Sequence, residues 1–311
     1  MRFVTYAGRE GDRAGLLVSE EVYALPPGVR LVDLLGDLPA AGTAALRDPA
    51  EVVPLESVRL RAPVPEPPTV RDFMTFEQHV EGVAKLMGAT VPEQWYAAPA
   101  FYFTNPYAVI GPHDDVPLPP GCGVFDFELE VAAVIGRGGR NLGVEEAAGH
   151  IAGYVLMNDW SARDLQLAEM EVLLGPVKGK DTATTLGPVL VTPDELEPYR
   201  SGNAYDLSMT AAVNGLTVGG DRWSNMSFSY AQMIAYASRG TEVRPGDVLG
   251  SGTCGGGCLA ELWGRLGLEA HAPLAPGDTV TISVDLLGVQ RCRIVEGAEP
   301  VGDSLEARRS P

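Results

Sequence analysis

The chain has 311 residues, of which 45% are hydrophobic and 21% charged, and its formal net charge at pH 7 is -18. This composition is typical of a globular protein with a large core, and at roughly 150 residues per domain the length allows two structural units. An acidic chain without a lysine- and arginine-rich cluster is a poor partner for nucleic acid or anionic membranes, and no apolar run approaches the roughly 20 residues of a membrane span. We therefore expect a cytoplasmic protein that binds neither nucleic acid nor a membrane.

The first 62 residues predict a small N-terminal β domain. Short apolar segments alternate with turns at residues 3–6, 15–18 and 22–25, and short helices are expected near residues 31–38 and 42–47. The proline-rich run at residues 62–68 indicates an extended linker, because proline fixes its own φ and favours an extended residue before it. We place a domain boundary there, which leaves residues 63–296 as a larger domain and residues 297–311 as a tail. With 37 glycines and 25 prolines to form turns, we expect a mixed α+β fold rich in β structure.

A helical pattern begins at Arg71 and extends to about Met87, with Gly88 as its stop. It contains His79, and a single histidine is more often structural than catalytic. The other three histidines are assigned structural roles: His113, His150 and His271. Further on, residues 99–110 carry aromatic side chains that either pack in the core or line a pocket.

Residues 125–132 alternate strictly between apolar and acidic side chains, which predicts a β-strand with its carboxylates on one face. Asp126, Glu128 and Glu130 share that face. At about 3.3 Å per residue, the last two lie roughly 6–7 Å apart at the backbone, close enough to converge on one hard cation such as Mg²⁺. A solvent-facing strand is the alternative, but repulsion between like charges and the apolar run at residues 132–135 favour a bound cation.

A buried strand at residues 154–157 delivers Asp159 close to its end, a common position for functional residues. Ser161 is expected to cap the next helix, where Arg163 and Gln166 are three residues apart and so share one face. Lys180 follows in a turn at residues 175–180, where a solvated lysine is the alternative to a functional one.

The C-terminal part predicts a hairpin, a helix and two strands. Asn214-Gly215 is typical of a type I′ turn, a helix is expected at residues 228–237, and strands are expected at residues 248–249 and 279–286. The glycine-rich segment at residues 250–258 lacks the Lys-Ser/Thr of a phosphate-binding loop, but its backbone N–H groups can approach a small anionic ligand. Glu261 follows among apolar residues.

Four cysteines are too few and too scattered for a disulfide framework: Cys122, Cys254, Cys258 and Cys292. Cys254 and Cys258 would suit half of a zinc site, but no second pair of cysteines or histidines follows at a suitable spacing. We therefore expect buried thiols.

Together these motifs resemble the fumarylacetoacetate hydrolase family over about residues 65–295. The segments that carry the resemblance are Phe127-Glu128-Leu129-Glu130, residues 158–166, Gly179-Lys180, Ser238-Arg239-Gly240, Pro245-Gly246-Asp247 and Gly252-Thr253. The resemblance implies the family's mixed β-sandwich roll, usually as a homodimer. Asn105 stands where many small members have a lysine before the proline, and the N-terminal unit is shorter than in the eukaryotic enzymes, so the substrate stays open.

The resemblance also implies roles for individual residues. The family's metal carboxylates match Glu128, Glu130 and Asp159, and Asp72 matches a fourth acid of the fumarylacetoacetate-cleaving members. The family's catalytic histidine matches His79, and its glutamate partner matches Glu261. The groups that contact the substrate match Arg163, Gln166, Lys180, Thr253 and, as a pocket tyrosine, Tyr102.

The function implied is hydrolysis of a C–C bond in a small anionic β-diketo acid, of the fumarylacetoacetate or acylpyruvate type. Mg²⁺ is the expected cofactor, with Ca²⁺ or Mn²⁺ as alternatives, because a cation can orient such a substrate and stabilise its enolate. His79, held by Glu261, would take a proton from water. A second hypothesis is decarboxylation of an oxaloacetate-like acid, or isomerisation of a 2-oxo dienoate, on the same metal site. A third is a non-catalytic ligand-binding protein.

Overall fold

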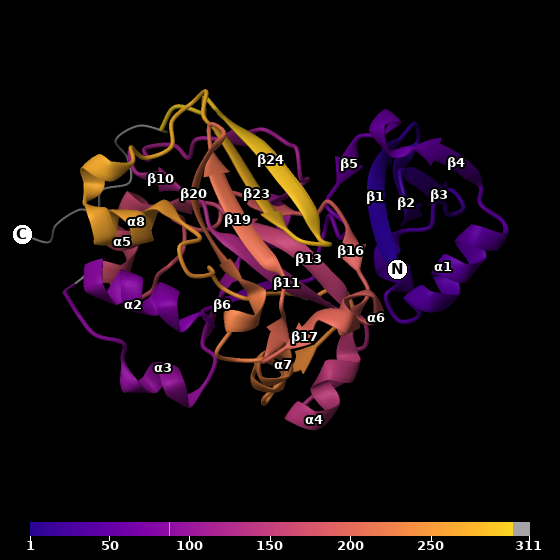
Figure 1. The fold of residues 1–311 in the computed structure, drawn as a ribbon, viewed down its shortest axis with the longest axis horizontal. Helices are drawn as coiled ribbons and strands as arrows, with labels where there is room; N and C mark the ends of the chain where they lie inside the picture. Colours follow the sequence, from indigo (N-terminus) through magenta and orange to yellow (C-terminus); the bar gives the residue numbers. More distant parts are fainter. Residues whose placement is uncertain (87, 301–311) are drawn as a thin grey trace, which may run out of the picture.

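Strands dominate the structure, a computed structural model that describes residues 1–86 and 88–300 (Figure 1). A large sheet of thirteen strands contains β1 (Arg2–Gly8), β2 (Gly11–Val18), β3 (Glu21–Ala24), β4 (Glu51–Pro54), β5 (Leu60–Arg61), β6 (Val70–Phe73), β7 (Phe101–Thr104), β8 (Val109–Ile110), β11 (Leu129–Ile135), β13 (Ile151–Asp159), β15 (Thr184–Leu186), β16 (Leu190–Val191) and β22 (Val248–Gly250). A five-stranded sheet contains β9 (Val116–Pro117), β19 (Ser208–Val213), β20 (Leu216–Arg222), β23 (Thr279–Val284) and β24 (Gly288–Val295). Three short pairs are β10 (Phe125–Asp126) with β14 (Ser161–Ala162), β12 (Gly139–Arg140) with β21 (Glu242–Val243), and β17 (Arg200–Ser201) with β18 (Ala204–Tyr205). The α-helices are α1 (Leu38–Arg47), α2 (Glu77–Leu86), α3 (Glu93–Ala97), α4 (Val144–Ala147), α5 (Arg163–Glu171), α6 (Pro193–Leu196), α7 (Tyr230–Ala237) and α8 (Leu259–Leu266).

The main core lies between the two sheets. The large sheet has the order β4-β3-β2-β1-β16-β13-β11-β22-β6-β7, and the five-stranded sheet has the order β20-β19-β23-β24-β9. The central strand β11 is buried on both faces: Val131 belongs to the core that contains Ile282 of β23, and Val134 belongs to a second core on the other face. Burial on both faces explains the continuous apolar run at residues 132–135, and the mixed α+β, β-rich fold class is confirmed.

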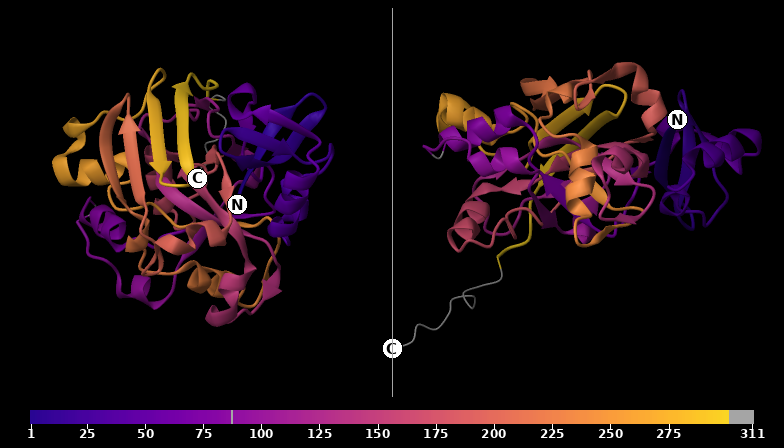
Figure 2. Two further views of the ribbon diagram at one scale, coloured as in Figure 1. Left: turned by 45° about the vertical axis from the view of Figure 1, so that its right-hand side comes forward. Right: turned by 90° about the horizontal axis from the view of Figure 1, so that it is seen from below.

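The N-terminal strands continue the large sheet. β1 pairs with β16, with Phe3 opposite Leu190, and the second core contains both Phe3 and Val134. These strands form one end of the molecule, coloured indigo in Figures 1 and 2. The division into domains at residue 62 stays a prediction.

The predicted helix at residues 71–87 is wrong at its start. Residues 70–73 form the buried strand β6 between β22 and β7, with Asp72 opposite Gly250 on one side and Tyr102 on the other. This strand is too short for its sequence pattern to distinguish it from a helix, and pairing with two neighbours decides its conformation. The helix α2 begins at Glu77. The expected end at Met87 lies outside the described residues, and Gly88 has the left-handed φ of +68° expected of a helix stop.

Other local predictions are confirmed. Asn214 and Gly215 have φ values of 51° and 80°, as a type I′ turn requires, and they connect β19 to β20. The helix expected at residues 228–237 is α7, and Ser229, whose role was not predicted, caps it by accepting a hydrogen bond from the N–H of Gln232. Residues 301–311 of the predicted tail lie outside the described part. Among the described residues, no helix is long and apolar enough to cross a membrane.

Candidate metal and catalytic site

Four carboxylates meet inside the large sheet. Asp72 comes from β6, Glu130 from β11 and Asp159 from the end of β13, and Glu128 directly precedes β11. One oxygen of each lies within 4.8 Å of the others, and none of the four residues is more than 5% exposed. The predicted convergence of Glu128 and Glu130 is therefore confirmed, and the alternative of a solvent-facing strand is wrong.

A glycine provides the space for this cluster. Gly250 lies in β22, between β11 and β6, and a Cβ at this position would lie 2.6 Å from Asp72 Oδ1 and 2.9 Å from Glu130 Oε2. Any larger residue would occupy the volume that the carboxylates share. This role of Gly250 was not predicted, although a glycine inside a buried strand is a known signal of close approach.

The donor set fits a hard divalent cation. Three oxygens of these four carboxylates are buried and have no hydrogen-bond partner among residues 1–86 and 88–300: Asp72 Oδ1, Glu130 Oε1 and Asp159 Oδ1. Leaving a buried carboxylate oxygen without a donor costs free energy, whereas Mg²⁺, Ca²⁺ and similar cations take oxygen ligands of this kind. The cluster thus has both the ligand type and the unused coordination capacity for a cation.

The electrostatics of the cluster agree with this fit. Burial, together with the nearby Asp159, raises the pKa of Asp72 to about 8. Burial and the charge of Asp72 raise the pKa of Glu130 well above its ordinary value, and burial also raises the pKa of Asp159. A bound cation would oppose these shifts, because it favours the ionised form of every carboxylate around it.

Two cationic side chains flank the cluster, the buried Lys180 and the partly buried Arg163. Lys180 Nζ lies 2.5 Å from Glu128 Oε2 and 2.6 Å from Asp159 Oδ2, so the alternative of a solvated turn lysine is wrong. Arg163 donates to Glu128 Oε1 at 2.8 Å and to Gln166 Oε1 at 3.1 Å. The second hydrogen bond confirms that Arg163 and Gln166 share one face of α5. Burial alone would raise the pKa of Glu128, but Lys180 and Arg163 outweigh burial and hold this pKa well below its usual range.

Asp126 departs from the prediction that it shares the carboxylate face. The chain leaves the strand conformation between β10 and β11, and Asp126 turns to the N-terminus of α8. It accepts hydrogen bonds from the backbone N–H groups of Leu259 at 2.8 Å and Ala260 at 3.0 Å, and from Arg163 Nε at 2.9 Å. Because a helix N-terminus attracts negative charge, Asp126 connects α8 to Arg163 instead of joining the cluster.

The predicted helix cap at Ser161 is also wrong. Ser161 lies in β14, and its hydroxyl donates to the backbone oxygen of Asp159 at 3.0 Å. The N-cap position of α5 is Ala162, which makes no side-chain hydrogen bond. Ser161 therefore supports the end of β13 that carries Asp159.

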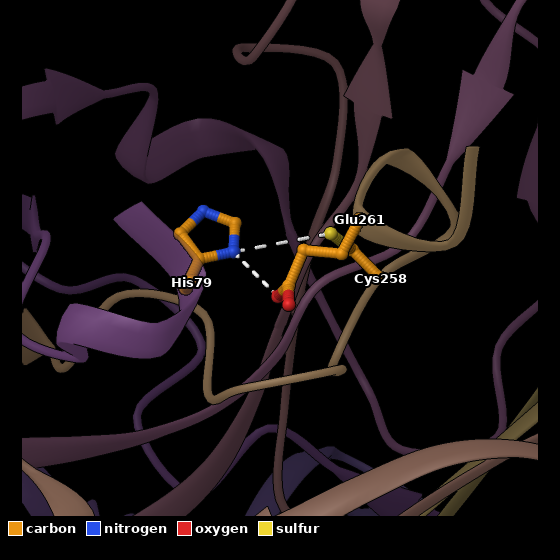
Figure 3. A group of neighbouring side chains, drawn as sticks. All are labelled: His79, Cys258 and Glu261. Carbon is orange, nitrogen blue, oxygen red and sulfur yellow. Dashed lines mark hydrogen bonds and ion pairs between the residues drawn. The ribbon is translucent and has the colours of Figure 1, made fainter. Parts of the chain in front are cut away.

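His79 and Glu261 form a buried pair between α2 and α8, shown in Figure 3. His79 Nδ1 lies 2.8 Å from Glu261 Oε1, and Glu261 Oε2 accepts from the backbone N–H of Gly256 at 2.8 Å and from Arg265. A Cβ at Gly82 of α2 would lie 3.0 Å from Glu261 Cγ, so this glycine allows the two helices to approach. The roles of Gly82 and Arg265 were not predicted, although the spacing of four residues from Glu261 to Arg265 is a local signal on a helix.

The two remaining predicted residues border the cluster. Tyr102 lies opposite Asp72 in β7, and its hydroxyl donates to Asp72 Oδ2 at 2.8 Å and to Asp159. Thr253 is buried in the glycine-rich loop, next to Gly252, whose N–H donates to Glu130 Oε2 at 3.0 Å. Contacts therefore connect the carboxylates to Tyr102, Lys180, Arg163 and Gln166, and the loop that contains Thr253 joins the carboxylates to α8.

Comparisons with known proteins agree with this architecture. A family model described as Fumarylacetoacetate (FAA) hydrolase C-terminal matches residues 69–295. The chain is similar to the fumarylacetoacetase of Arabidopsis thaliana, at 33% identity over 68% of this chain and 63% of that protein. It is also similar to the mitochondrial oxaloacetate tautomerase FAHD2A of Homo sapiens, at 32% identity over 79% of this chain and 72% of that protein. The match thus spans less than two thirds of the plant relative's length.

A solved structure shows the shared fold. The maleylpyruvate hydrolase from Sphingobium sp. SYK-6, determined with manganese(II) and pyruvate, has a TM-score of 0.71 to this structure at 24% identity, over 96% of this chain and 100% of that chain. The expected fold type is confirmed. With more than half of its residues matched by the family model, the chain belongs to the fumarylacetoacetate hydrolase family.

Proposed function

We propose that the protein is a divalent-metal-dependent hydrolase that cleaves a C–C bond in a small β-diketo acid, of the fumarylacetoacetate or acylpyruvate type. The observation that carries this proposal is the combination of a buried four-carboxylate cluster with a buried histidine–glutamate pair. A carboxylate cluster suits a cation that stabilises an enolate, and an imidazole held by a carboxylate suits proton transfer from water. Hydrolysis needs both.

Asp72, Glu128, Glu130 and Asp159 would hold the cation, for which we propose Mg²⁺, with Ca²⁺ or Mn²⁺ as alternatives. The three carboxylate oxygens without hydrogen-bond donors support this assignment. When bound, the cation would supply a Lewis acid for substrate oxygens that gain negative charge.

His79 would act as the general base. Glu261 is an acceptor only, so the proton of the imidazole lies on Nδ1 and the lone pair of Nε2 is free to accept a proton from water. Gly256 and Arg265 hold the other oxygen of Glu261, which fixes the carboxylate and therefore the orientation of the ring.

Lys180, Arg163 and Gln166 would bind the oxygens of an anionic substrate, with Thr253 and Tyr102 at the edges of the site. A chain of net charge -18 repels anions at long range, so local cationic groups are needed where a small acid binds. Lys180 and Arg163 are both in contact with Glu128, next to the proposed cation. They are therefore well placed to balance a substrate carboxylate and a developing oxyanion.

The second candidate is oxaloacetate tautomerisation or decarboxylation, or isomerisation of a 2-oxo dienoate, on the same carboxylates. The similarity to the human oxaloacetate tautomerase, over 79% of this chain, favours keeping it. These reactions also pass through an enolate, but they need no hydrolytic water. A ligand-binding protein without turnover is the third candidate.

The test is direct product analysis. Metal-stripped protein is incubated with acylpyruvates, fumarylacetoacetate and oxaloacetate, with and without Mg²⁺, beside a His79→Asn variant. Pyruvate or acetoacetate together with a free acid, formed only with Mg²⁺ and by the wild-type protein, is the expected result. Carbon dioxide or an isomerised substrate without cleavage would replace the hydrolase with the second candidate. Mg²⁺ binding without any turnover would favour the third. A homodimer in the cytoplasm stays a prediction.

A further inference from the structure

A thiol lies beside the proposed base. Cys258 directly precedes α8, and its Sγ lies 4.0 Å from His79 Nδ1, the same ring nitrogen that contacts Glu261 (Figure 3). Ligand atoms of His79, Cys258 and Glu261 lie within 4.8 Å of one another, and all three side chains are buried. Imidazole nitrogen, thiolate sulfur and carboxylate oxygen are the three ligand types of zinc sites, whereas Mg²⁺ takes oxygen.

The distances are close to those of a tetrahedral zinc site. With Zn–N and Zn–O bonds of about 2.0 Å and a Zn–S bond of about 2.3 Å, nitrogen and sulfur lie about 3.6 Å apart, and nitrogen and oxygen about 3.3 Å apart. The observed distances from His79 Nδ1 are 4.0 Å to Cys258 Sγ and 2.8 Å to Glu261 Oε1. A tetrahedral site therefore needs His79 Nδ1 about 0.4 Å closer to Cys258 Sγ and about 0.5 Å further from Glu261 Oε1.

We propose that His79, Cys258 and Glu261 form a second cation site, selective for Zn²⁺ and other soft cations, whose occupation inhibits the enzyme. The selectivity follows from the sulfur ligand, which the carboxylate cluster lacks. The inhibition rests on the proposed function of His79. A cation on Nδ1 leaves the ring proton on Nε2, so Nε2 can no longer take a proton from water.

The tertiary structure brings together three ligands that no local sequence motif contains. Cys254 and Cys258 have no second ligand pair nearby in sequence, but α2 brings His79 to Cys258 from 179 residues earlier, and Glu261 follows Cys258 within the first turn of α8. Burial, and after it the charge of Asp126, raise the pKa of the Cys258 thiol well above its ordinary value. A bound cation must displace this proton, which makes binding weaker than at a site with a preformed thiolate and suits reversible inhibition.

Cobalt absorbance tests binding without any need for turnover. A Co²⁺–thiolate bond gives charge-transfer absorption that oxygen ligands do not give, and excess Mg²⁺ keeps the carboxylate cluster filled. We expect the absorption band in the wild-type protein and in Cys122→Ser, because Cys122 is not one of the three ligands of the proposed zinc site. The band should be lost in Cys258→Ser. No band in the wild-type protein, or an equal band in Cys258→Ser, would overturn the proposal. Because substrate is absent, failure of the proposed function would not affect this result.

Inhibition by Zn²⁺ tests the consequence. Rates are measured at saturating Mg²⁺, and each variant is compared with its own rate without zinc. Cys258→Ser should raise the Zn²⁺ concentration for half-inhibition by more than about tenfold, because even changes outside the ligand shell cost 10–100-fold in metal affinity. Cys122→Ser should leave this concentration unchanged. If additional Mg²⁺ abolishes inhibition, zinc acts at the carboxylates and the proposal is wrong.

Discussion

Replacing Gly250 with alanine tests the space inside the carboxylate cluster. A Cβ at this position would lie 2.6 Å from Asp72 Oδ1 and 2.9 Å from Glu130 Oε2, closer than real Cβ contacts allow. Both oxygens belong to buried side chains that pack against each other, so the cluster has to distort. We expect a loss of about 1–3 kcal/mol in the free energy of unfolding, the usual cost of overpacking a core.

The stronger prediction concerns the response to Mg²⁺. A cation that binds only the folded state stabilises it by RT ln(1 + [L]/Kd), about 2.7 kcal/mol at 100 times its Kd. For a chain of 311 residues, that free energy corresponds to a rise in Tm of roughly 4 °C. The Gly250→Ala variant should lose most of this rise at the same Mg²⁺ concentration, as measured by scanning calorimetry. A variant that keeps the full rise would refute the assignment of the cation to this cluster.

Gly149→Ala is the matched control. The atom closest to a Cβ at Gly149 is the flexible Arg137 Nη2, at 3.7 Å, so alanine fits there without displacing backbone or core atoms. We expect its stability to stay within about 0.5 kcal/mol of the wild-type value, the usual range for surface substitutions. The Mg²⁺-dependent rise in Tm should be unchanged.

His79→Asn should lower turnover by roughly 10²–10⁴-fold, the usual contribution of a general acid or base, while Mg²⁺ still raises Tm; parallel loss of both properties would contradict the assignment of His79. Gly82→Ala should lower kcat even though alanine favours a helix, because its Cβ would lie 3.0 Å from Glu261 Cγ. Steady-state kinetics at saturating Mg²⁺ checks this, and a normal kcat would mean that α2 shifts without disturbing the pair. Burial raises the pKa of Asp72 to about 8. The Asp72 carboxyl group therefore contributes to the free energy of unfolding of the metal-free protein at low pH, and this contribution is lost as pH rises from about 4 to about 8. Protons leave the cluster over the same range, so the Mg²⁺-dependent rise in Tm should be larger near pH 8 than near pH 6, and the opposite trend would contradict the titration of the cluster.

Local rules account for what the sequence predicted correctly. The alternation at residues 127–131 identified both the buried apolar face and the two glutamates that converge, because side chains in a strand alternate with a period of two. The turn at Asn214-Gly215 depends on the conformation of two residues only. The resemblance to a family then connected distant motifs, such as His79 and Glu261, that no local pattern relates.

The failures concern residues whose environment comes from elsewhere in the chain. Asp72 lies on a strand because β22 and β7 pair with it on both sides, and a four-residue segment carries too little periodicity to show this. Asp126 does not lie with the other carboxylates, because its carboxylate accepts a hydrogen bond from the backbone at the N-terminus of α8, more than 130 residues later. The space beside Gly250, and the approach of Cys258 to His79, are likewise tertiary facts.

A crystal structure of the protein grown with Mn²⁺, with anomalous scattering used to locate the cation, tests whether the four carboxylates hold a metal ion. We expect a strong anomalous peak at coordinating distance from oxygens of Asp72, Glu128, Glu130 and Asp159. A peak only at another position, or no peak with the four side chains arranged as they are here, would contradict this expectation.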